Sequence, residues 1–233
     1  MYKTLMLKIY QQTIARPVKI EGIGLHSGKK SKIKILPAKE DQGIIFKRLD
    51  VKKNNLIFAD HTNVSDTQLC TTLKNDHEVK VNTVEHLLAA LYISEIDNAI
   101  IEIDNIEVPI MDGSAYPFIN ILNKTKKVQL SKKRRYLKIT ENFSLENKGR
   151  KISIKPNDTF EVEYKLNFAN KIIGSQKNSV NFQTDDLKNI YTSRTFCLYE
   201  DIEKIKKLGL AKGGSLDNAI VVDKDKVLNE GGL

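Results

Sequence analysis

Apolar side chains recur along this chain at two different spacings, which predict a mixture of helices and strands. Around residues 84–91 they follow the spacing of one helical face, at Val84, Leu87, Leu88 and Leu91. In residues 31–36 and 160–168 apolar and polar side chains alternate instead, as they do in half-buried strands. The pattern therefore predicts a protein of the α+β class.

The first half of the chain predicts a sheet backed by helices on one face. Residues 18–36 form an expected hairpin, and glycines at 22, 24 and 28 allow its sharp turn. Further strands are expected at residues 43–46, 67–73, 79–81 and 98–103. A second helix is expected at residues 117–122, where Pro117 occupies a favourable first position.

The second half begins after a polar, basic stretch at residues 124–135. Such charge runs are typical of solvated linkers, and a phosphate or lipid contact is the alternative. We therefore divide the chain into a first domain at 1–125, a linker at 126–135 and a second domain at 136–233. The expected elements of the second domain are a hairpin at 136–154 turning at 147–149, a strand at 160–168, helices at 185–192 and 200–208, and a strand at 218–222.

A four-residue sequence, Asp-Asn-Ala-Ile, occurs at residues 97–100 and again at 217–220. Each copy leads into an expected strand. This repetition favours a duplicated α+β unit, although a chance match of four residues is the alternative.

The formal net charge of +9 allows a nucleic-acid partner. However, the lysines are spread over the whole chain and few aromatic residues lie among them, so we expect no nucleic-acid binding. The charge instead favours an anionic small molecule such as a sugar nucleotide, or transient contact with a negatively charged membrane face. We expect a monomer.

The sequence also indicates a compartment. No apolar run approaches the length of a membrane span, and lysine interrupts the first eight residues too early for a signal peptide. Cys70 and Cys197 form neither a CxxC pair nor a disulfide framework, which fits a reducing compartment. We therefore expect a cytoplasmic protein.

The strongest chemical candidates are Glu85 and His86, which stand side by side at the start of the expected helix and off its apolar stripe. A neutral imidazole can bind a divalent metal, and a neighbouring carboxylate can take a proton from a water molecule on that metal. The alternative is structural: Asn82 caps the helix, Glu85 completes a capping box, and His86 is a solvated histidine.

Two further residues have both a structural and a functional interpretation. His26 lies in the turn of the first hairpin, where it either bonds its own turn or lines an active site. Cys70 lies in the expected strand 67–73, where a free cysteine is usually inert packing.

Several segments together resemble the LpxC family of UDP-3-O-acyl-N-acetylglucosamine deacetylases. They are TVEHL at residues 83–87, GIGLHSGK at 22–29, VPIMDGS at 108–114, RTF at 194–196, GGS at 213–215 and VLN at 227–229. They follow the family's order from near residue 20 to residue 233. The resemblance implies a fold of two similar domains, each a β-α-α-β sandwich, and a zinc-dependent enzyme of lipid A biosynthesis that removes an N-acetyl group from a UDP-linked acylated glucosamine.

The resemblance also implies roles for single residues. His86 matches a zinc ligand, Glu85 the general base, and Thr195 a hydroxyl that stabilises the oxyanion, where a helix-end threonine is the alternative. It places Cys70 near the metal without making it a ligand. The residues that match an acyl-chain passage are Phe196, Ile202, Ala211, Gly214 and Ser215. Phe168 and Arg150 match positions that hold the uracil and the phosphates.

The sequence stops at residues 231–233. At this point the resemblance implies a following helix with two more zinc ligands and, further on, a histidine that acts as general acid. We therefore expect a truncated second domain, an inactive and only marginally folded chain, and activity that depends on the missing segment. The competing hypothesis is a non-catalytic remnant of the family that binds a sugar nucleotide or a partner protein.

Overall fold

The computed structural model describes residues 9–230, so our expectations for the first eight residues and for residues 231–233 lie outside the described part of the chain. A five-stranded sheet with the strand order β2-β3-β9-β4-β5 forms the centre of the first half. Its strands are β2 (Val18–Ile23), β3 (Lys30–Pro37), β9 (Ala99–Ile103), β4 (Ile44–Arg48) and β5 (Leu56–Phe58). The pairings are antiparallel except between β4 and β9, which run parallel.

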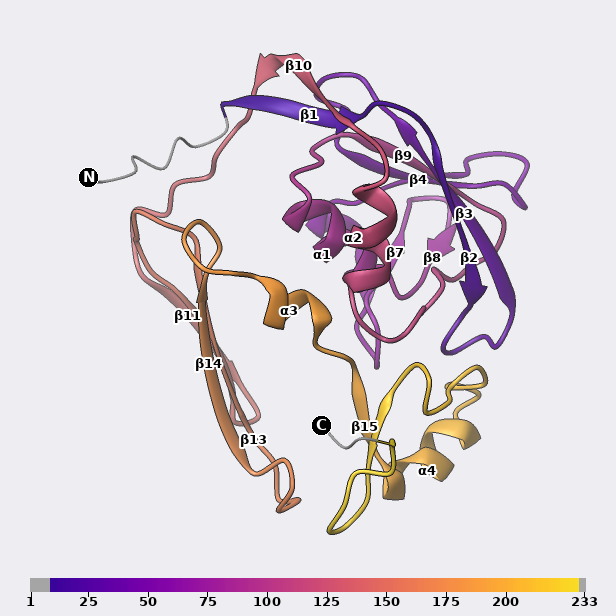
Figure 1. The fold of residues 1–233 in the computed structure, drawn as a ribbon, viewed down its shortest axis with the longest axis vertical. Coiled ribbons are helices and arrows are strands. Elements are labelled where there is room, and N and C mark those ends of the chain that lie inside the picture. The colour runs from indigo at the N-terminus through magenta and orange to yellow at the C-terminus, as the bar shows by residue number, and fades with distance from the viewer. Residues whose placement is uncertain (1–8, 231–233) are drawn as a thin grey trace.

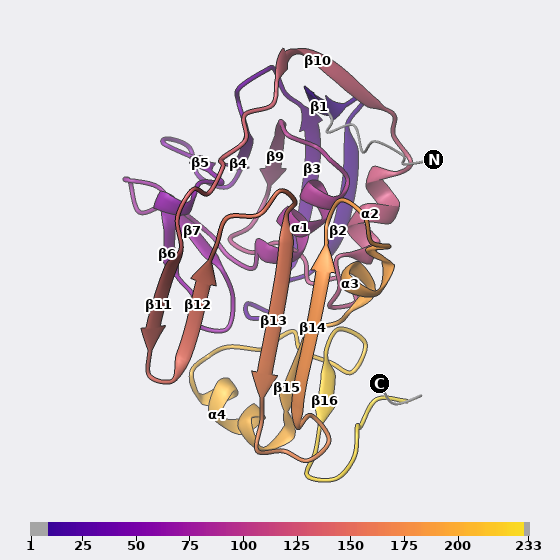
Figure 2. The same cartoon turned by 90° about the vertical axis from the view of Figure 1, so that its left-hand side faces the viewer.

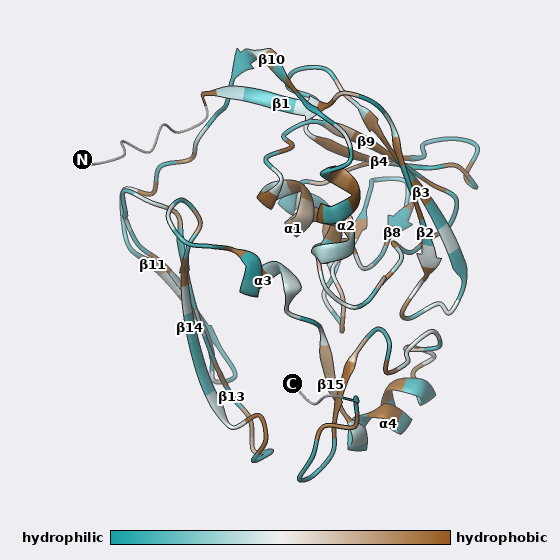
Figure 3. Ribbon diagram, viewed as in Figure 1, coloured by the Kyte–Doolittle hydropathy of each residue, from teal (hydrophilic) through white to brown (hydrophobic). Residues whose placement is uncertain are grey.

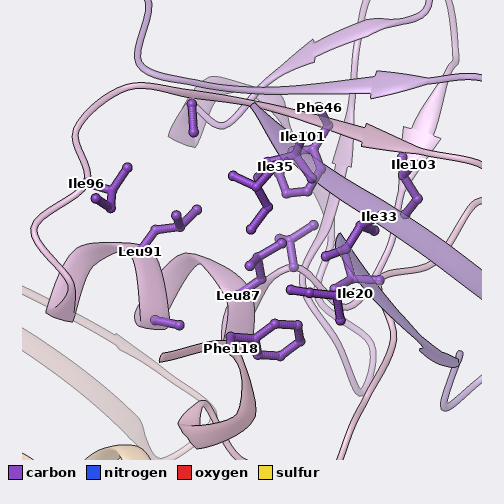
Figure 4. Packing of buried hydrophobic residues seen from close by; sticks show 14 of the residues in the cluster. Ile20, Ile33, Ile35, Phe46, Leu87, Leu91, Ile96, Ile101, Ile103 and Phe118 are labelled. Carbon is purple, nitrogen blue, oxygen red and sulfur yellow. The ribbon is translucent and has the colours of Figure 1, made fainter. Parts of the chain in front are cut away.

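Two helices, α1 (Glu85–Ile93) and α2 (Tyr116–Leu122), cover one face of this sheet (Figure 1). Alternate sheet residues point at them, because side chains in a strand alternate between its two faces. Figure 4 shows Leu87 and Leu91 of α1 and Phe118 of α2 against the sheet. The sheet residues labelled in that cluster are Ile20, Ile33, Ile35, Phe46, Ile101 and Ile103, all at most 4% exposed. The predicted sheet with helices on one face is confirmed.

Smaller sheets flank the central one. Strands β6 (Val64–Asp66), β7 (Thr72–Lys74) and β8 (Lys80–Val81) form an antiparallel sheet. Between β5 and β6 lies the 3-10 helix η1 (His61–Asn63). Strand β1 (Tyr10–Ile14) pairs antiparallel with β10 (Lys127–Lys133). Most of the basic stretch that we expected as a polar linker is therefore a strand, although its side chains are mostly exposed.

The second half consists of hairpins, short helices and one parallel pair of strands. Figure 2 shows the hairpin of β11 (Phe143–Asn147) and β12 (Arg150–Ile154) beside that of β13 (Glu161–Asn167) and β14 (Ser175–Asn181). After them come α3 (Lys188–Thr192), β15 (Phe196–Leu198), η2 (Tyr199–Asp201), α4 (Ile202–Lys207) and β16 (Ile220–Val222). β15 and β16 run parallel.

The two halves bury very different amounts of apolar surface. The large core lies in the first half, whereas the buried cluster of the second half consists of Ile173, Ile220 and Val222. Figure 3 shows hydrophobic residues gathered on β4, β9 and the two helices, whereas β13 and β14 are largely hydrophilic. The structure is therefore a mixed assembly of helices and several small sheets.

Most predicted elements of the second half occur, with shifted bounds. The hairpin turn falls between β11 and β12 at residues 148–149, and α4 ends before Gly209, which has a φ of +78°. The predicted helix start at residue 185 is wrong, because α3 begins at Lys188 with Leu187 as its N-cap. Asp185 and Asp186 instead accept hydrogen bonds from the backbone N–H groups of Asn181 and Lys188. Between residues 9 and 230, no helix is long and apolar enough to cross a membrane.

Candidate functional site

The first turn of α1 carries the central pair of side chains, Glu85 and His86. Thr83 adopts a φ of +57°, and the helix begins two residues later with Val84 as its N-cap and no side-chain cap. The structural alternative, a capping box of Asn82 and Glu85, is therefore wrong. Asn82 instead forms a parallel bridge with Glu107, and the Glu85 carboxylate accepts a 3.0 Å hydrogen bond from the Thr71 backbone N–H.

His86 is partly buried, and this burial lowers the pKa of its imidazole below the usual value. The carboxylates of Glu85 and Asp112 oppose the shift without cancelling it. The ring is therefore predominantly neutral near pH 7, which is the form that binds metals. The VPIMDGS segment at residues 108–114 contains Asp112, but nothing in its sequence pattern indicates that this carboxylate acts on His86.

Asp112 belongs to a tight turn in the first half of the chain, and this turn contacts the second half. Its Oδ1 accepts hydrogen bonds from the N–H and the hydroxyl of Ser114, at 2.9 and 2.7 Å. The next residue, Gly113, has a φ of +86°, and a Cβ there would collide with the carbonyl oxygen of Asn218. Only glycine fits this close approach without a shift of backbone.

Thr195 is attached to the same turn. Its N–H donates a 2.8 Å hydrogen bond to the Gly113 carbonyl, and its own carbonyl accepts one from Ile220. The residue lies directly before β15, three residues after the end of α3, so the alternative of a helix-end threonine is wrong. The turn thus brings Thr195 to the segment of Asp112, whose carboxylate opposes the lowering of the His86 pKa.

His26 does not simply bond its own turn. Its ring contacts the Leu69 carbonyl at 3.3 Å and accepts a 3.4 Å hydrogen bond from the Ala211 N–H. Burial alone lowers its pKa, but the Cys70 side chain, the Glu107 carboxylate and the Leu69 carbonyl together raise it above the usual value. His26 therefore connects three separate segments of the chain.

Cys70 lies in a bend between β6 and β7, so its predicted position inside a strand is wrong. Burial alone raises the pKa of its thiol, but hydrogen bonds with His26, Thr72 and the Thr83 backbone bring the pKa below its usual value. The thiol and the His26 imidazole thus stabilise each other's charged form.

The residues matched to the substrate lie on several elements. The ring of Phe168 packs edge-on against Phe196, with centroids 5.4 Å apart. Ala211 bonds His26, as described, and Ser215 donates its N–H to the Asn218 side chain at 2.9 Å. Ile202 at the start of α4 is half-buried, Gly214 is exposed, and Arg150 is exposed at the turn end of the β11–β12 hairpin.

The donor set near α1 fits part of a metal site. His86 offers a neutral imidazole, with the carboxylates of Glu85 and Asp112 acting on it. Among residues 9–230, however, no group of three or more histidine, cysteine, aspartate or glutamate side chains lies close enough to hold a metal ion. A catalytic zinc ion requires about three protein ligands. The described residues therefore fit one ligand of such a site and do not complete it.

Comparisons with known proteins agree with these motifs. The sequence model of a family described as LpxC, UDP-3-O-acyl N-acetylglycosamine deacetylase, matches residues 11–233. A UDP-3-O-acyl-N-acetylglucosamine deacetylase of Hamiltonella defensa is 41% identical over 229 residues, which are 97% of this chain and 74% of the relative. One of the same name from Nautilia profundicola is 39% identical over 221 residues, which are 94% of this chain and 75% of the relative.

Proposed function

The chain belongs to the LpxC family of UDP-3-O-acyl N-acetylglycosamine deacetylases, and from that membership we propose that its residues serve the deacetylation of UDP-3-O-acyl-N-acetylglucosamine in lipid A biosynthesis. The observation that carries the proposal is the meeting of the Glu85-His86 pair with the Asp112 turn, to which Thr195 is bonded. In this reaction water adds to the acetyl carbonyl, the C–N bond breaks, and acetate and a free amine result.

Enzymes of this family use zinc, and here His86 is the residue that would hold it. When bound, zinc makes a water molecule acidic enough to attack at neutral pH and polarises the carbonyl. Glu85 takes a proton from the attacking water in its role as general base. Its hydrogen bond from the Thr71 N–H supports this role, because it fixes the carboxylate beside His86 and leaves further lone pairs for water.

Thr195 stabilises the negative charge that develops on the acetyl oxygen, in the proposed mechanism, by donating its hydroxyl. Its backbone bonds on both sides support this role, since they hold the residue at the Asp112 turn through main-chain atoms and do not use the hydroxyl. Phe196, Ile202, Ala211, Gly214 and Ser215 form the acyl-chain side of the site, and Phe168 and Arg150 the nucleotide side. The contact between Phe168 and Phe196 supports adjacent positions for these two parts.

The positive charge of the protein supports an anionic partner. Besides the substrate's diphosphate, we propose transient contact with the anionic inner face of the membrane, by a monomer that works in the cytoplasm. The exposed Lys133 of β10, the exposed Arg135 that follows it and the neighbouring Leu137, which is 90% exposed, combine positive charge with an apolar side chain. This combination is typical of surfaces that lie on anionic lipid.

The proposed fold is a duplicated one, with a first domain at 1–125, a linker at 126–135 and a second domain at 136–233. The repeated Asp-Asn-Ala-Ile sequence supports it. Asn98 and Asn218 are both buried, and each side chain hydrogen-bonds a backbone group of a neighbouring loop. Each asparagine also precedes a strand that has a parallel partner, β9 with β4 and β16 with β15.

A second part of the proposal is that the 233-residue chain alone is inactive. The resemblance implies three zinc ligands, of which His86 is the one matched here. The competing candidate, a non-catalytic binder of sugar nucleotides, draws on the same Phe168 and Phe196 contact. It differs because it requires nucleotide binding without any turnover.

Acetate release from UDP-3-O-acyl-N-acetylglucosamine tests both parts. The comparison uses the 233-residue chain and an extended form, which carries the family's C-terminal segment from the Hamiltonella defensa relative after residue 233. We expect zinc-dependent turnover from the extended form alone. Nucleotide binding by both forms without acetate release would favour the binder, and turnover by the short chain would show that its own residues complete the site.

A further inference from the structure

Glu107 is a buried acid that has no part in the mechanism above. Its side chain lies between two segments of the candidate site and is 1% exposed. The Oε1 atom accepts hydrogen bonds from the His26 N–H at 2.8 Å and the Thr83 hydroxyl at 2.9 Å. The Oε2 atom accepts one from the Ser27 N–H at 2.7 Å. Three donors from two segments thus converge on one carboxylate.

This arrangement requires a carboxylate rather than an amide. Both oxygens of a carboxylate accept hydrogen bonds, whereas a glutamine would direct an NH₂ group at one set of donors. Burial of a carboxylate is unfavourable unless hydrogen bonds compensate for the lost water. A buried carboxylate with three hydrogen bonds is therefore expected to hold the segments that donate them in fixed positions.

One segment that Glu107 holds is the glycine-histidine loop between β2 and β3. A Cβ on Gly24 would collide with the Glu107 Oε2 and the Ser27 hydroxyl, so the loop lies directly on the carboxylate. The loop in turn contacts the second half of the chain. The N–H groups of Lys212 and Gly213 donate to the carbonyls of His26 and Leu25, at 3.3 and 3.0 Å.

The other segment leads into α1. Thr83 has a φ of +57°, an uncommon conformation for a β-branched residue. Its hydroxyl bonds Glu107, and backbone bonds join both flanks of that acid to Asn82. These run from the Asn82 N–H to Ile106 at 2.8 Å and from the Val108 N–H to Asn82 at 3.1 Å. Glu85 and His86 follow Thr83 by two and three residues.

We infer that Glu107 is a positioning residue, which holds the start of α1 and the glycine-histidine loop in a fixed relation to each other. Through Thr83 it sets the position of Glu85 and His86. Through His26 and the backbone of its loop it sets the position of the 211–213 segment on the substrate side. The inference rests on the roles proposed for Glu85 and His86, and it adds the group that aligns them with that side of the site.

Histidine ring NMR signals of the metal-free 233-residue chain test this inference. The chain has four histidines, of which His61 and His77 are exposed and serve as internal references. We expect Glu107→Gln to shift the signals of both His26 and His86, to leave the two references unchanged, and to accelerate amide exchange at His26 and Ser27 by about tenfold or more. The matched control is Glu102→Gln, which removes a carboxylate on β9 that pairs with Lys47.

If Glu107→Gln does not fold, substitutions of Thr83 test the hydrogen bond between the Thr83 hydroxyl and Glu107 from the other side. Thr83→Val removes the hydroxyl donor at nearly constant volume, and Thr83→Ser retains it. We expect the valine variant to shift the His86 signal and the serine variant to restore it. An unchanged His86 signal in folded Glu107→Gln or Thr83→Val would overturn the inference. Because these signals require neither zinc nor turnover, failure of the proposed reaction would be detected separately.

Discussion

Thr195 is held at the site by its backbone, through bonds to Gly113 and Ile220, and its side chain is half-buried. Removal of the hydroxyl should therefore affect the reaction more than the fold. In the extended form, we expect Thr195→Ala to lower kcat by about 10²–10³, the usual effect of losing one oxyanion donor. Thr195→Ser should retain most of the activity.

Steady-state kinetics and thermal melts of the same preparations check this prediction. The melting temperature of Thr195→Ala should stay close to that of the unmodified protein. Wild-type turnover in the alanine variant would remove Thr195 from the mechanism, and a large drop in melting temperature would indicate a structural role instead.

His26 predicts a pH dependence of stability. Its pKa is raised in the folded protein by Cys70, Glu107 and the Leu69 carbonyl, against burial and against the Ala211 N–H, which only the neutral ring can accept. Protonation of His26 therefore favours the folded state, and this stabilisation is complete below the unfolded pKa of about 6.5 and disappears as pH rises through the folded pKa. The stability difference between the unmodified chain and His26→Gln should shrink between pH 6 and pH 9.

Denaturant titrations of both proteins at several pH values measure that difference. His77→Gln, a substitution of an exposed histidine outside the site, is the comparison variant. A difference for His26→Gln that stays constant with pH, or grows toward pH 9, would contradict the assigned direction.

The sequence indicates Glu85 and His86 directly, because they are adjacent and off the apolar stripe. It does not indicate the partners of His26, because Leu69 and Ala211 are 43 and 185 residues away and bond it through backbone atoms. The same holds for Asp112, whose effect on His86 depends on the packing of α1 beside a distant turn. Long-range backbone contacts leave no pattern in the side chains.

At the scale of elements, the turn at Gly113 joins the first half to β15 and β16. Alanine at this position would combine an unfavourable positive φ with a collision at the Asn218 carbonyl. Gly43 has a similar φ of +66° but no atom within 4 Å of an added Cβ, so it isolates the cost of the φ angle.

We expect Gly43→Ala to lower the free energy of unfolding by about 1–2 kcal/mol. Gly113→Ala should lower it by roughly 1–3 kcal/mol more, since overpacking adds to the strain. Denaturant titrations of both variants check the difference. Equal losses would show that the approach of Asn218 to Gly113 does not constrain the fold.

Elements with a strong periodic pattern could be predicted from sequence, and elements fixed by tertiary pairing could not. The stripe of Leu87 and Leu91 predicts α1, but the capping alternative is wrong because Thr83 adopts a positive φ and the helix begins only at Glu85. Strand β10 was not predicted because it is polar and basic; it forms through its register with β1, in which Thr13 faces Val128 and Ile14 faces Lys127.

At the scale of the whole molecule, the halves should differ in local stability. β11 and β12 are exposed along their whole length, and Leu145 and Ile152 are 68% and 63% exposed. Regions with few buried apolar contacts open at low free-energy cost. We therefore expect trypsin to degrade the region beyond Arg135 first, and to leave a resistant fragment that ends near β10.

Mass spectrometry of a digestion time course checks the order of cleavage. The undigested chain should also bind an apolar dye. First cuts within α1, α2 or the central sheet would contradict the prediction. So would a chain that resists trypsin throughout and melts as one unit. The sequence alone could indicate this difference only in part, since the alternation at residues 160–168 predicts β13 but not what covers it.

The central claim is that Glu85 acts on water while His86 holds zinc. Zinc content and acetate release, measured on the same samples of the extended form, test this division most directly. We predict that Glu85→Ala keeps nearly full zinc content and loses turnover, whereas His86→Ala loses both. Equal loss of zinc in the two variants, or turnover by Glu85→Ala close to that of the unmodified protein, would contradict the account.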